Sequence, residues 1–403
     1  MAVDQTVTGL TRLEDPYPHY AAWRAESPVL WDQAGNGWTV TGYEAVAGML
    51  RDPRFGADRE DIFFGHMDGE RRNRFDYLAR IQRAMMLFAD PPLHTRLRGL
   101  VNRAFTPRVV AAMRETIQSV VDELLDAVPP GGQMDVIRDL AYPLPTMVIA
   151  RLLGVPAEDR DRLKAWSDDF AMFIGGGSGV PGVGERADAS VREMASYLGA
   201  IVAARRVTPQ IDLISTLLLA EERGDVLGDD ELYATCILML IAGHETTTNL
   251  IGNGVRALLD HPDERHRLIA GDVPMESAVE ELLRFDSPVQ VTSRRALADV
   301  VWDGQAIRTG QFVDLWFGAA NRDPSRFRDP DDLLLGRPDN RHLAFGFGAH
   351  FCIGAPLARL EGTMAIGTLL RRFPDLARDE PGVPLVYADT TVFRALRRLP
   401  VRT

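Results

Sequence analysis

The feature that most constrains the fold of this chain is an unbroken helical pattern from Asp229 to Asp260. At a rise of about 1.5 Å per residue, a helix of roughly 45 Å results, around which other elements must pack. Acidic residues at its start suit the positive end of a helix dipole. His261, followed by a proline, suits its end. We therefore predict one long central helix.

The middle of this segment, residues 242–248, is unfavourable for a helix because it holds a glycine and three successive threonines. Glycine costs about 1 kcal/mol in a helix interior, and threonine hydroxyls can bond back to the i−4 carbonyl and bend the helix. Such conflict is often found at functional sites, although a packing kink explains this stretch equally well. Glu245 also needs a partner or a task in an apolar helix.

Helical patterns dominate the rest of the chain, so we predict a mainly α fold with a smaller β part. The expected helices cover residues 93–105, 109–128, 189–206 and 276–285. The expected strands cover 29–31 and 38–41, which flank a Gly-Asn-Gly turn as in a hairpin, and 294–297, 300–302 and 312–315. We expect the glycine-rich stretch 175–184 to be a mobile loop, and residues 1–403 to form a single domain.

Composition and charge argue against several classes of function. The net charge of −12 disfavours nucleic acid as a partner, since phosphate binding needs a basic surface. No apolar run reaches the roughly 18–20 residues that cross a bilayer, and the first ten residues lack the pattern of a secretory signal. We therefore expect a cytoplasmic protein without a membrane anchor. Two cysteines are too few for an all-cysteine zinc or iron–sulfur site.

The two cysteines have very different surroundings. Cys236 lies in an apolar helical stretch, where a cysteine is usually a small buried hydrophobe. The second cysteine lies in the motif F-x-x-G-x-x-x-C-x-G, formed by Phe345, Gly348, Cys352 and Gly354. A helix begins just after this motif. The unpaired N–H groups and positive dipole at a helix N-terminus lower a thiol pKa. Cys352 is therefore the better candidate for a thiolate that binds a metal.

Four segments, taken together, resemble the cytochrome P-450 family in its soluble bacterial branch. They are the basic helix at 94–98, Ala-Gly-His-Glu-Thr-Thr at 242–247, Glu-x-x-Arg at 281–284 and the cysteine loop at 345–354. The resemblance covers nearly the whole chain. It implies the cytochrome P-450 fold, with haem b (iron protoporphyrin IX) between the long central helix and the cysteine loop. The implied activity is that of an oxidoreductase, a haem-thiolate monooxygenase.

The resemblance also implies roles for individual residues. Cys352 would be the iron ligand, Glu245 and Thr246 the acid–alcohol pair that manages protons for bound dioxygen, and Ala242 and Gly243 would face the oxygen pocket. The residues implied to hold the haem propionates are His94, Arg98, Arg294 and His350, with Arg295 as an alternative to Arg294.

The Glu-x-x-Arg pair, Glu281 and Arg284, would be structural by the same resemblance, and His342 would complete its network. One stretch departs from the family pattern. Bacterial members often carry an arginine and a phenylalanine where this chain reads Asp-Pro-Asp-Asp-Leu-Leu at 329–334. This departure leaves the third partner of the pair open.

The implied reaction inserts one oxygen atom from O2 into a lipophilic small molecule, by hydroxylation or epoxidation. The side chains we expect to contact it are Phe63, Phe88, Leu240, Val289, Val291, Val392 and Phe393. No flavin, nicotinamide or iron–sulfur motif is present, so a separate ferredoxin and ferredoxin reductase would supply electrons. The arginines that could form a patch for an acidic ferredoxin are Arg96, Arg98, Arg103, Arg108 and Arg359.

Three other readings remain open. A haem-thiolate peroxygenase would use peroxide directly, but such enzymes usually lack an acid–alcohol pair like Glu245 and Thr246. A recruitment module of the same fold without haem would not need Cys352. A reductase of a small inorganic substrate is the third.

Overall fold

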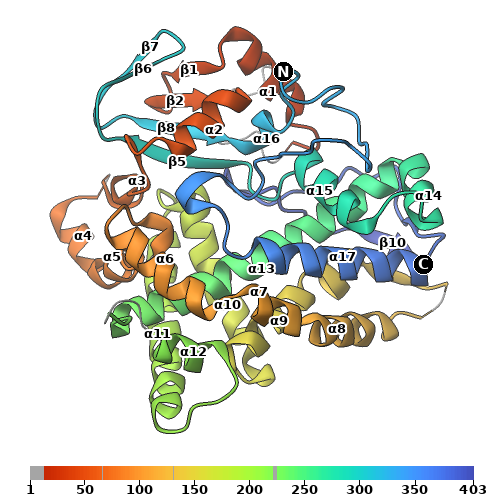
Figure 1. Ribbon diagram of the computed structural model, residues 1–403, viewed down its shortest axis with the longest axis horizontal. Helices are drawn as coiled ribbons and strands as arrows, with labels where there is room; N and C mark the ends of the chain where they lie inside the picture. Colours follow the sequence, from red (N-terminus) through yellow and green to blue (C-terminus); the bar gives the residue numbers. More distant parts are fainter. Residues whose placement is uncertain (1–12, 66, 130, 221–224) are drawn as a thin grey trace. The chain divides into compact units, whose positions relative to one another are not determined.

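The computed structural model describes residues 13–65, 67–129, 131–220 and 225–403. Contacts divide the chain into two compact units. The first holds the described residues up to Gly56, Ile117–Leu144 and Thr246–Thr403, and the second holds Ala57–Thr116 and Pro145–Glu245. Helix α13, Asp229–Asp260, has the bounds expected from the sequence and supplies residues to both units (Figure 1). The sequence-based expectation that residues 1–403 form a single haem domain stays a prediction.

The first unit contains a five-stranded sheet with strand order β1-β2-β8-β5-β3. Its strands are β1 (Val29–Asp32), β2 (Gly37–Val40), β3 (Phe55–Gly56), β5 (Val291–Ala296) and β8 (Phe312–Trp316). β1 and β2 form the predicted antiparallel hairpin, and β8 pairs parallel with β2 and antiparallel with β5. Val40, Val313 and Leu315 of this sheet pack with Val46 and Met49 of α2 in a buried core.

Two smaller sheets complete the β part of this unit. β6 (Val300–Trp302) was predicted, but its partner β7 (Gln305–Ile307) was not. The other sheet joins three strands, β4 (Gln133–Asp135), β10 (Pro400–Arg402) and β9 (Ala377–Arg378). These strands have two or three residues, which is too short for an alternating pattern to show in the sequence.

The helices of the first unit are α1 (Tyr17–Glu26), α2 (Tyr43–Arg51), α14 (Pro262–Ala270), α15 (Met275–Phe285), α16 (Phe317–Ala320) and α17 (Ala355–Arg372), with the short turns η3 (Ile137–Ala141) and η6 (Gly348–His350). α15 packs against α17. The sequence therefore brings the Glu-x-x-Arg helix beside the helix that follows the cysteine loop (Figure 1).

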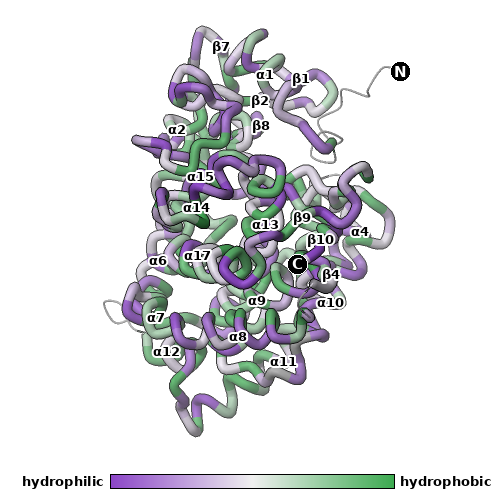
Figure 2. The backbone as a smooth tube through the Cα atoms, turned by 90° about the vertical axis from the view of Figure 1, so that its right-hand side faces the viewer, coloured by the Kyte–Doolittle hydropathy of each residue, from purple (hydrophilic) through white to green (hydrophobic). Residues whose placement is uncertain are grey.

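The described part of the second unit is helical. Its elements are α3 (Glu60–Phe64), α4 (Gly69–Arg74), α5 (Asp76–Arg83), η2 (Met86–Phe88), α6 (Leu93–Ala104), α7 (Pro107–Ala112), η4 (Ala157–Asp159), α10 (Arg160–Met172), η5 (Phe173–Gly177), α11 (Val183–Val207) and α12 (Leu213–Leu219). α8 (Arg114–Asp126) and α9 (Pro143–Leu153) have residues in both units. α8 carries both hydrophobic and hydrophilic residues (Figure 2), and its buried residues Ile117, Val120, Val121 and Leu125 recur every three or four positions, as in an amphipathic helix.

Three predictions about helices and the loop between them need correction. The single helix expected over 109–128 is split into α7 and α8, because the Met113 N–H bonds to the carbonyl of Val110, three residues back, and tightens the turn. The loop expected over 175–184 is partly helical, since η5 is a π-helical turn that includes Gly176 at φ 105°. α11 also begins six residues before the predicted start at Ala189.

Within the described residues, none of the helices is both long and apolar enough to cross a membrane. The first ten residues, in which the sequence shows no secretory pattern, lie outside the described part of the chain.

Candidate active site

The cysteine loop of the first unit ends directly at the N-terminus of α17. The Cys352 N–H donates to the carbonyl of Phe345 at 2.9 Å and closes the loop. Gly348 has φ +73°, and a Cβ there would lie 2.6 Å from the carbonyl oxygen of Leu50, so only glycine fits. Pro356 occupies the first turn of α17, as predicted. The glycines of the motif therefore shape a loop that presents Cys352 to the positive end of a helix.

The surroundings of the two cysteines differ as expected. Cys352 is half-buried, and a Cβ on Gly354 would lie 3.7 Å from its sulfur, so this glycine keeps one side of the sulfur open. Cys236 is fully buried in α13, where burial raises the pKa of its thiol to about 12. Cys236 is therefore a protonated core residue, whereas Cys352 lies just before the N-terminus of α17, where the positive end of the helix dipole favours a thiolate.

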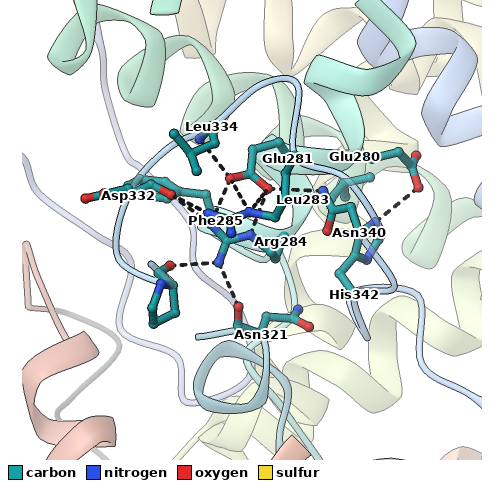
Figure 3. Close-up of polar contacts among 12 residues, drawn as sticks. Glu280, Glu281, Leu283, Arg284, Phe285, Asn321, Asp332, Leu334, Asn340 and His342 are labelled. Atoms are coloured by element: carbon teal, nitrogen blue, oxygen red, sulfur yellow. Dashed lines mark hydrogen bonds and ion pairs between the residues drawn. The ribbon is translucent and has the colours of Figure 1, made fainter. Parts of the chain in front are cut away.

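Glu281 and Arg284 of α15 form the predicted pair and are fully buried, each 0% exposed (Figure 3). Arg284 donates from Nε and Nη2 to the two carboxylate oxygens, both at 2.8 Å. Its remaining N–H groups donate to the backbone carbonyls of Asn321, Pro330 and Asp332. A carboxylate and a guanidinium buried at this depth need such saturation, because each unpaired charge would be costly.

The third partner that the sequence left open is Arg337. Its Nε donates to both oxygens of Glu281, at 3.0 and 3.1 Å, and its side chain is 5% exposed. The arginine missing from 329–334 is thus supplied a few residues later, before Pro338. An unassigned arginine in the stretch between the Glu-x-x-Arg helix and the cysteine loop was the available signal.

The prediction that His342 completes this network needs correction. Its Nε2 lies 3.2 Å from Glu280, the residue before Glu281, and Asn340 bonds to Glu281 instead (Figure 3). Glu280 also accepts two hydrogen bonds from Arg359. Two neighbouring carboxylates of α15 therefore anchor two separate polar clusters.

The middle of α13 is helical without a break, but its exposure pattern is unusual. Ala242 is exposed and Gly243, Glu245 and Thr246 are half-buried, although most flanking residues are buried. Open positions in an otherwise buried helix suit a helix that faces a large ligand. His244 is buried, and its Nδ1 lies 3.0 Å from the Leu240 carbonyl.

An acidic neighbour of this stretch was not found from the sequence. A carboxylate oxygen of Asp168, on α10, lies within 4.8 Å of ligand atoms of both His244 and Glu245. Its own partner is Lys164, one helical turn away. Sequence reasoning could not find it because contact between α10 and α13 depends on tertiary packing.

The propionate candidates lie on three elements. In the second unit, His94 and Arg98 lie one turn apart on α6, with His94 buried and Arg98 half-buried. In the first unit, Arg294 of β5 is buried, whereas Arg295 is half-exposed beside the ring of Phe312, which favours Arg294. His350 ends η6 in the cysteine loop. Hydrogen-bond donors of this kind suit carboxylates, and Arg98 and Arg294 also carry a positive charge.

The predicted substrate residues form separate groups. In the second unit, the rings of Phe63 and Phe88 lie 5.6 Å apart, and Phe173 stacks on Phe63 at 5.4 Å. Leu240 is buried in α13. In the first unit, Val289 and Phe393 form an isolated β-bridge. Val291 and Val392 pack in a core cluster with Trp316, so their substrate role stays a prediction.

The proposed arginine patch is smaller than the sequence suggested. Arg96 is engaged in ion pairs with Glu231 and Asp225, and Arg359 is bound by Glu280. Arg103 and Arg108 are exposed on and after α6. Two of the five arginines therefore already have acidic partners within this chain.

Comparisons with known proteins agree with this geometry. The family model described as Cytochrome P450 matches residues 186–270 and 274–385. Cytochrome P450 monooxygenase PikC of Streptomyces venezuelae is 41% identical, over 96% of this chain and 91% of the relative. Vitamin D(3) 25-hydroxylase of Pseudonocardia autotrophica is 42% identical, over 96% and 94%. The crystal structure of P450BioI in complex with an acyl carrier protein ligated to hexadec-9Z-enoic acid has a TM-score of 0.89 at 40% identity, over 97% and 98%.

Proposed function

The chain belongs to the cytochrome P450 family of monooxygenases, and from that premise we propose that Cys352 is the thiolate ligand of its haem iron. The reaction we propose is insertion of one oxygen atom from O2 into a lipophilic small molecule, by hydroxylation or epoxidation. The observation that carries this proposal is the placement of Cys352 in a glycine-shaped loop at the N-terminus of α17. The family itself implies a haem-thiolate cofactor; its identity as haem b is part of the proposal.

The donors available suit iron protoporphyrin IX. Cys352 would bind the iron, and His94, Arg98, Arg294 and His350 would neutralise the propionates. When bound, the haem would supply the oxygen chemistry, and a thiolate ligand would donate electron density to the iron. The protein supplies position, charge and protons.

Protons for this reaction would be moved by Glu245 and Thr246. Both are half-buried on α13, so they can exchange protons with solvent while the neighbouring helix turns stay packed. The Thr246 hydroxyl can donate one hydrogen bond and accept another, which suits a relay. The Glu245 carboxyl would take up a proton and pass it to the Thr246 hydroxyl, which would donate its own proton towards the oxygen pocket.

A cluster of aromatic side chains indicates the kind of substrate, and two exposed arginines indicate where an electron donor would bind. The aromatic cluster of Phe63, Phe88 and Phe173 suits a lipophilic molecule. Electrons would come from a ferredoxin and its reductase, with Arg103 and Arg108 as cationic contacts. Because one solved relative carries its fatty acid on an acyl carrier protein, free and carrier-bound substrates both belong in a screen.

The test is the absorption spectrum of the reduced, CO-bound protein. We expect the Soret band of a thiolate-ligated haem in the wild type and its loss in Cys352→Ser, with loss of substrate oxidation. Cys236→Ser is the matched control and should keep the band, since that thiol is buried in the core. A Cys352→Ser protein with an unaltered band would disprove the assignment.

A peroxygenase is the second candidate that the same protein can test. Turnover with peroxide but none with O2 and reductant would favour it. Glu245 and Thr246 favour the O2-dependent reaction, because protons must be supplied while O2 is being cleaved.

A further inference from the structure

A second polar cluster of the first unit lies beside the cysteine loop and is centred on Glu280. Arg359 of α17 donates to its carboxylate from Nε at 2.6 Å and from Nη2 at 2.8 Å. This is the bidentate geometry in which a guanidinium binds a carboxylate most specifically. The pair joins α15 to the second turn of α17, the helix whose N-terminus follows Cys352.

His342 supplies the third donor of the cluster. Its Nδ1 accepts the backbone N–H of Ala344 at 3.2 Å, so Nε2 carries the proton and donates to Glu280 at 3.2 Å. Burial alone would raise the pKa of Glu280, but the hydrogen bonds from Arg359 and His342 outweigh burial and lower this pKa to about 2. Glu280 is therefore an anion that offsets the charge of Arg359.

Arg359 connects this cluster to the cysteine in two ways. Its guanidinium lies 4.6 Å from the centre of the Phe345 ring, and the Phe345 carbonyl accepts the Cys352 N–H. The pKa of Arg359 is raised, first by its hydrogen bond to Glu280, and a negative charge on the Cys352 sulfur would raise it further. Arg359 therefore packs against the ring of Phe345 in the cysteine loop and would stabilise a negative charge on the sulfur.

We propose that the Glu280–Arg359 pair is a positioning device that sets the net charge next to the Cys352 thiolate and thereby the reduction potential of the iron it binds. The proposal rests on the proposed function, in which Cys352 is the ligand. Local charge and hydrogen bonding are among the means by which proteins tune a thiolate-bound iron. The side chains of Glu280 and Arg359 are 28% and 38% exposed, so water screens both charges. We therefore expect the pair to adjust the reduction potential without determining it alone.

The test uses the opposite signs of the two charges. Reduction adds one electron to the site, so a nearby positive charge favours the reduced form. Glu280→Gln leaves Arg359 without its counter-charge, and we expect a more positive midpoint potential. Arg359→Gln leaves a negative charge, and we expect a more negative midpoint potential. The double variant, which restores neutrality, should lie close to the wild type.

A purely structural role would give a different result. Both single variants break the same ion pair, so loosening of the loop alone would move the potential in the same direction in each. The C–O stretching frequency of the reduced, CO-bound protein is a second readout, and it should rise in Glu280→Gln and fall in Arg359→Gln. Matched controls are Glu276→Gln and Arg371→Gln, exposed residues of the same two helices, which should leave both readouts unchanged.

Shifts of the same sign in the two single variants, or none in either, would overturn the proposal. If Glu280→Gln fails to retain haem, Arg359→Gln and the double variant still decide, because neither leaves an unpaired cation beside the loop. Failure of the proposed function would be recognised separately, since the wild type itself would then lack the Soret band of a thiolate-bound haem.

Discussion

Glu280 and Glu281 are neighbours on α15, yet they anchor two clusters of opposite character (Figure 3). Glu281 is 0% exposed and binds Arg284 and Arg337, whose other donors are used by backbone carbonyls. Glu280 is 28% exposed and binds Arg359 and His342 near the cysteine. Two adjacent residues therefore belong to a buried network that suits stabilising the fold and to a partly hydrated network that suits adjusting the properties of the nearby cysteine.

The largest effect that would test this contrast is on Glu281. Glu281→Gln removes the charge that offsets Arg284 and Arg337 and leaves two buried guanidinium groups unmatched. We expect a loss of about 3–5 kcal/mol in the free energy of unfolding. Urea unfolding measures it, with Glu276→Gln on the same helix as the control. A loss below that of Glu280→Gln would reverse the assignment of the two clusters.

A smaller loss is expected for Arg337→Lys. Lysine keeps the positive charge but lacks the planar set of donors that reaches Glu281 and the carbonyls of Arg328, Asp329 and Asp332. We expect a loss of about 1–3 kcal/mol. Thermal unfolding of the purified holoprotein would measure it. Arg328→Lys, at an exposed neighbouring position, is the control and should unfold like the wild type.

The smallest effect on stability is expected for Glu280→Gln, a loss at neutral pH below that of the two substitutions above, because the ion pair is partly hydrated. Its pH dependence is more informative. The folded pKa of Glu280 is lowered to about 2, below an unfolded value of about 4.3. The contribution of Glu280 is therefore present above pH about 4.3 and is lost as the pH falls towards 2.

The measurement is the difference in unfolding free energy between the wild type and Glu280→Gln across that pH range. The difference should shrink as the pH falls. A difference that stays constant would mean that the carboxylate charge of Glu280 does not contribute to folding.

The two clusters also show how far the sequence could be interpreted. The i, i+3 spacing predicted that Glu281 and Arg284 share a face, because helix geometry is local. Arg337 follows Glu281 by 56 residues, and the stretch between them includes strands and loops whose path no periodicity reveals. For the same reason His342 was assigned to the wrong one of two adjacent carboxylates.

Sequence alone determined the elements whose signals are local. These are the bounds of α13, the β1–β2 hairpin and the helix that starts just after Cys352. Hydrophobic periodicity, turn residues and motif spacing act over a few residues, so they can be interpreted without a fold. Tertiary structure alone decided which arginine completes the Glu281 network and which carboxylate binds Arg359, because those contacts depend on how distant segments pack.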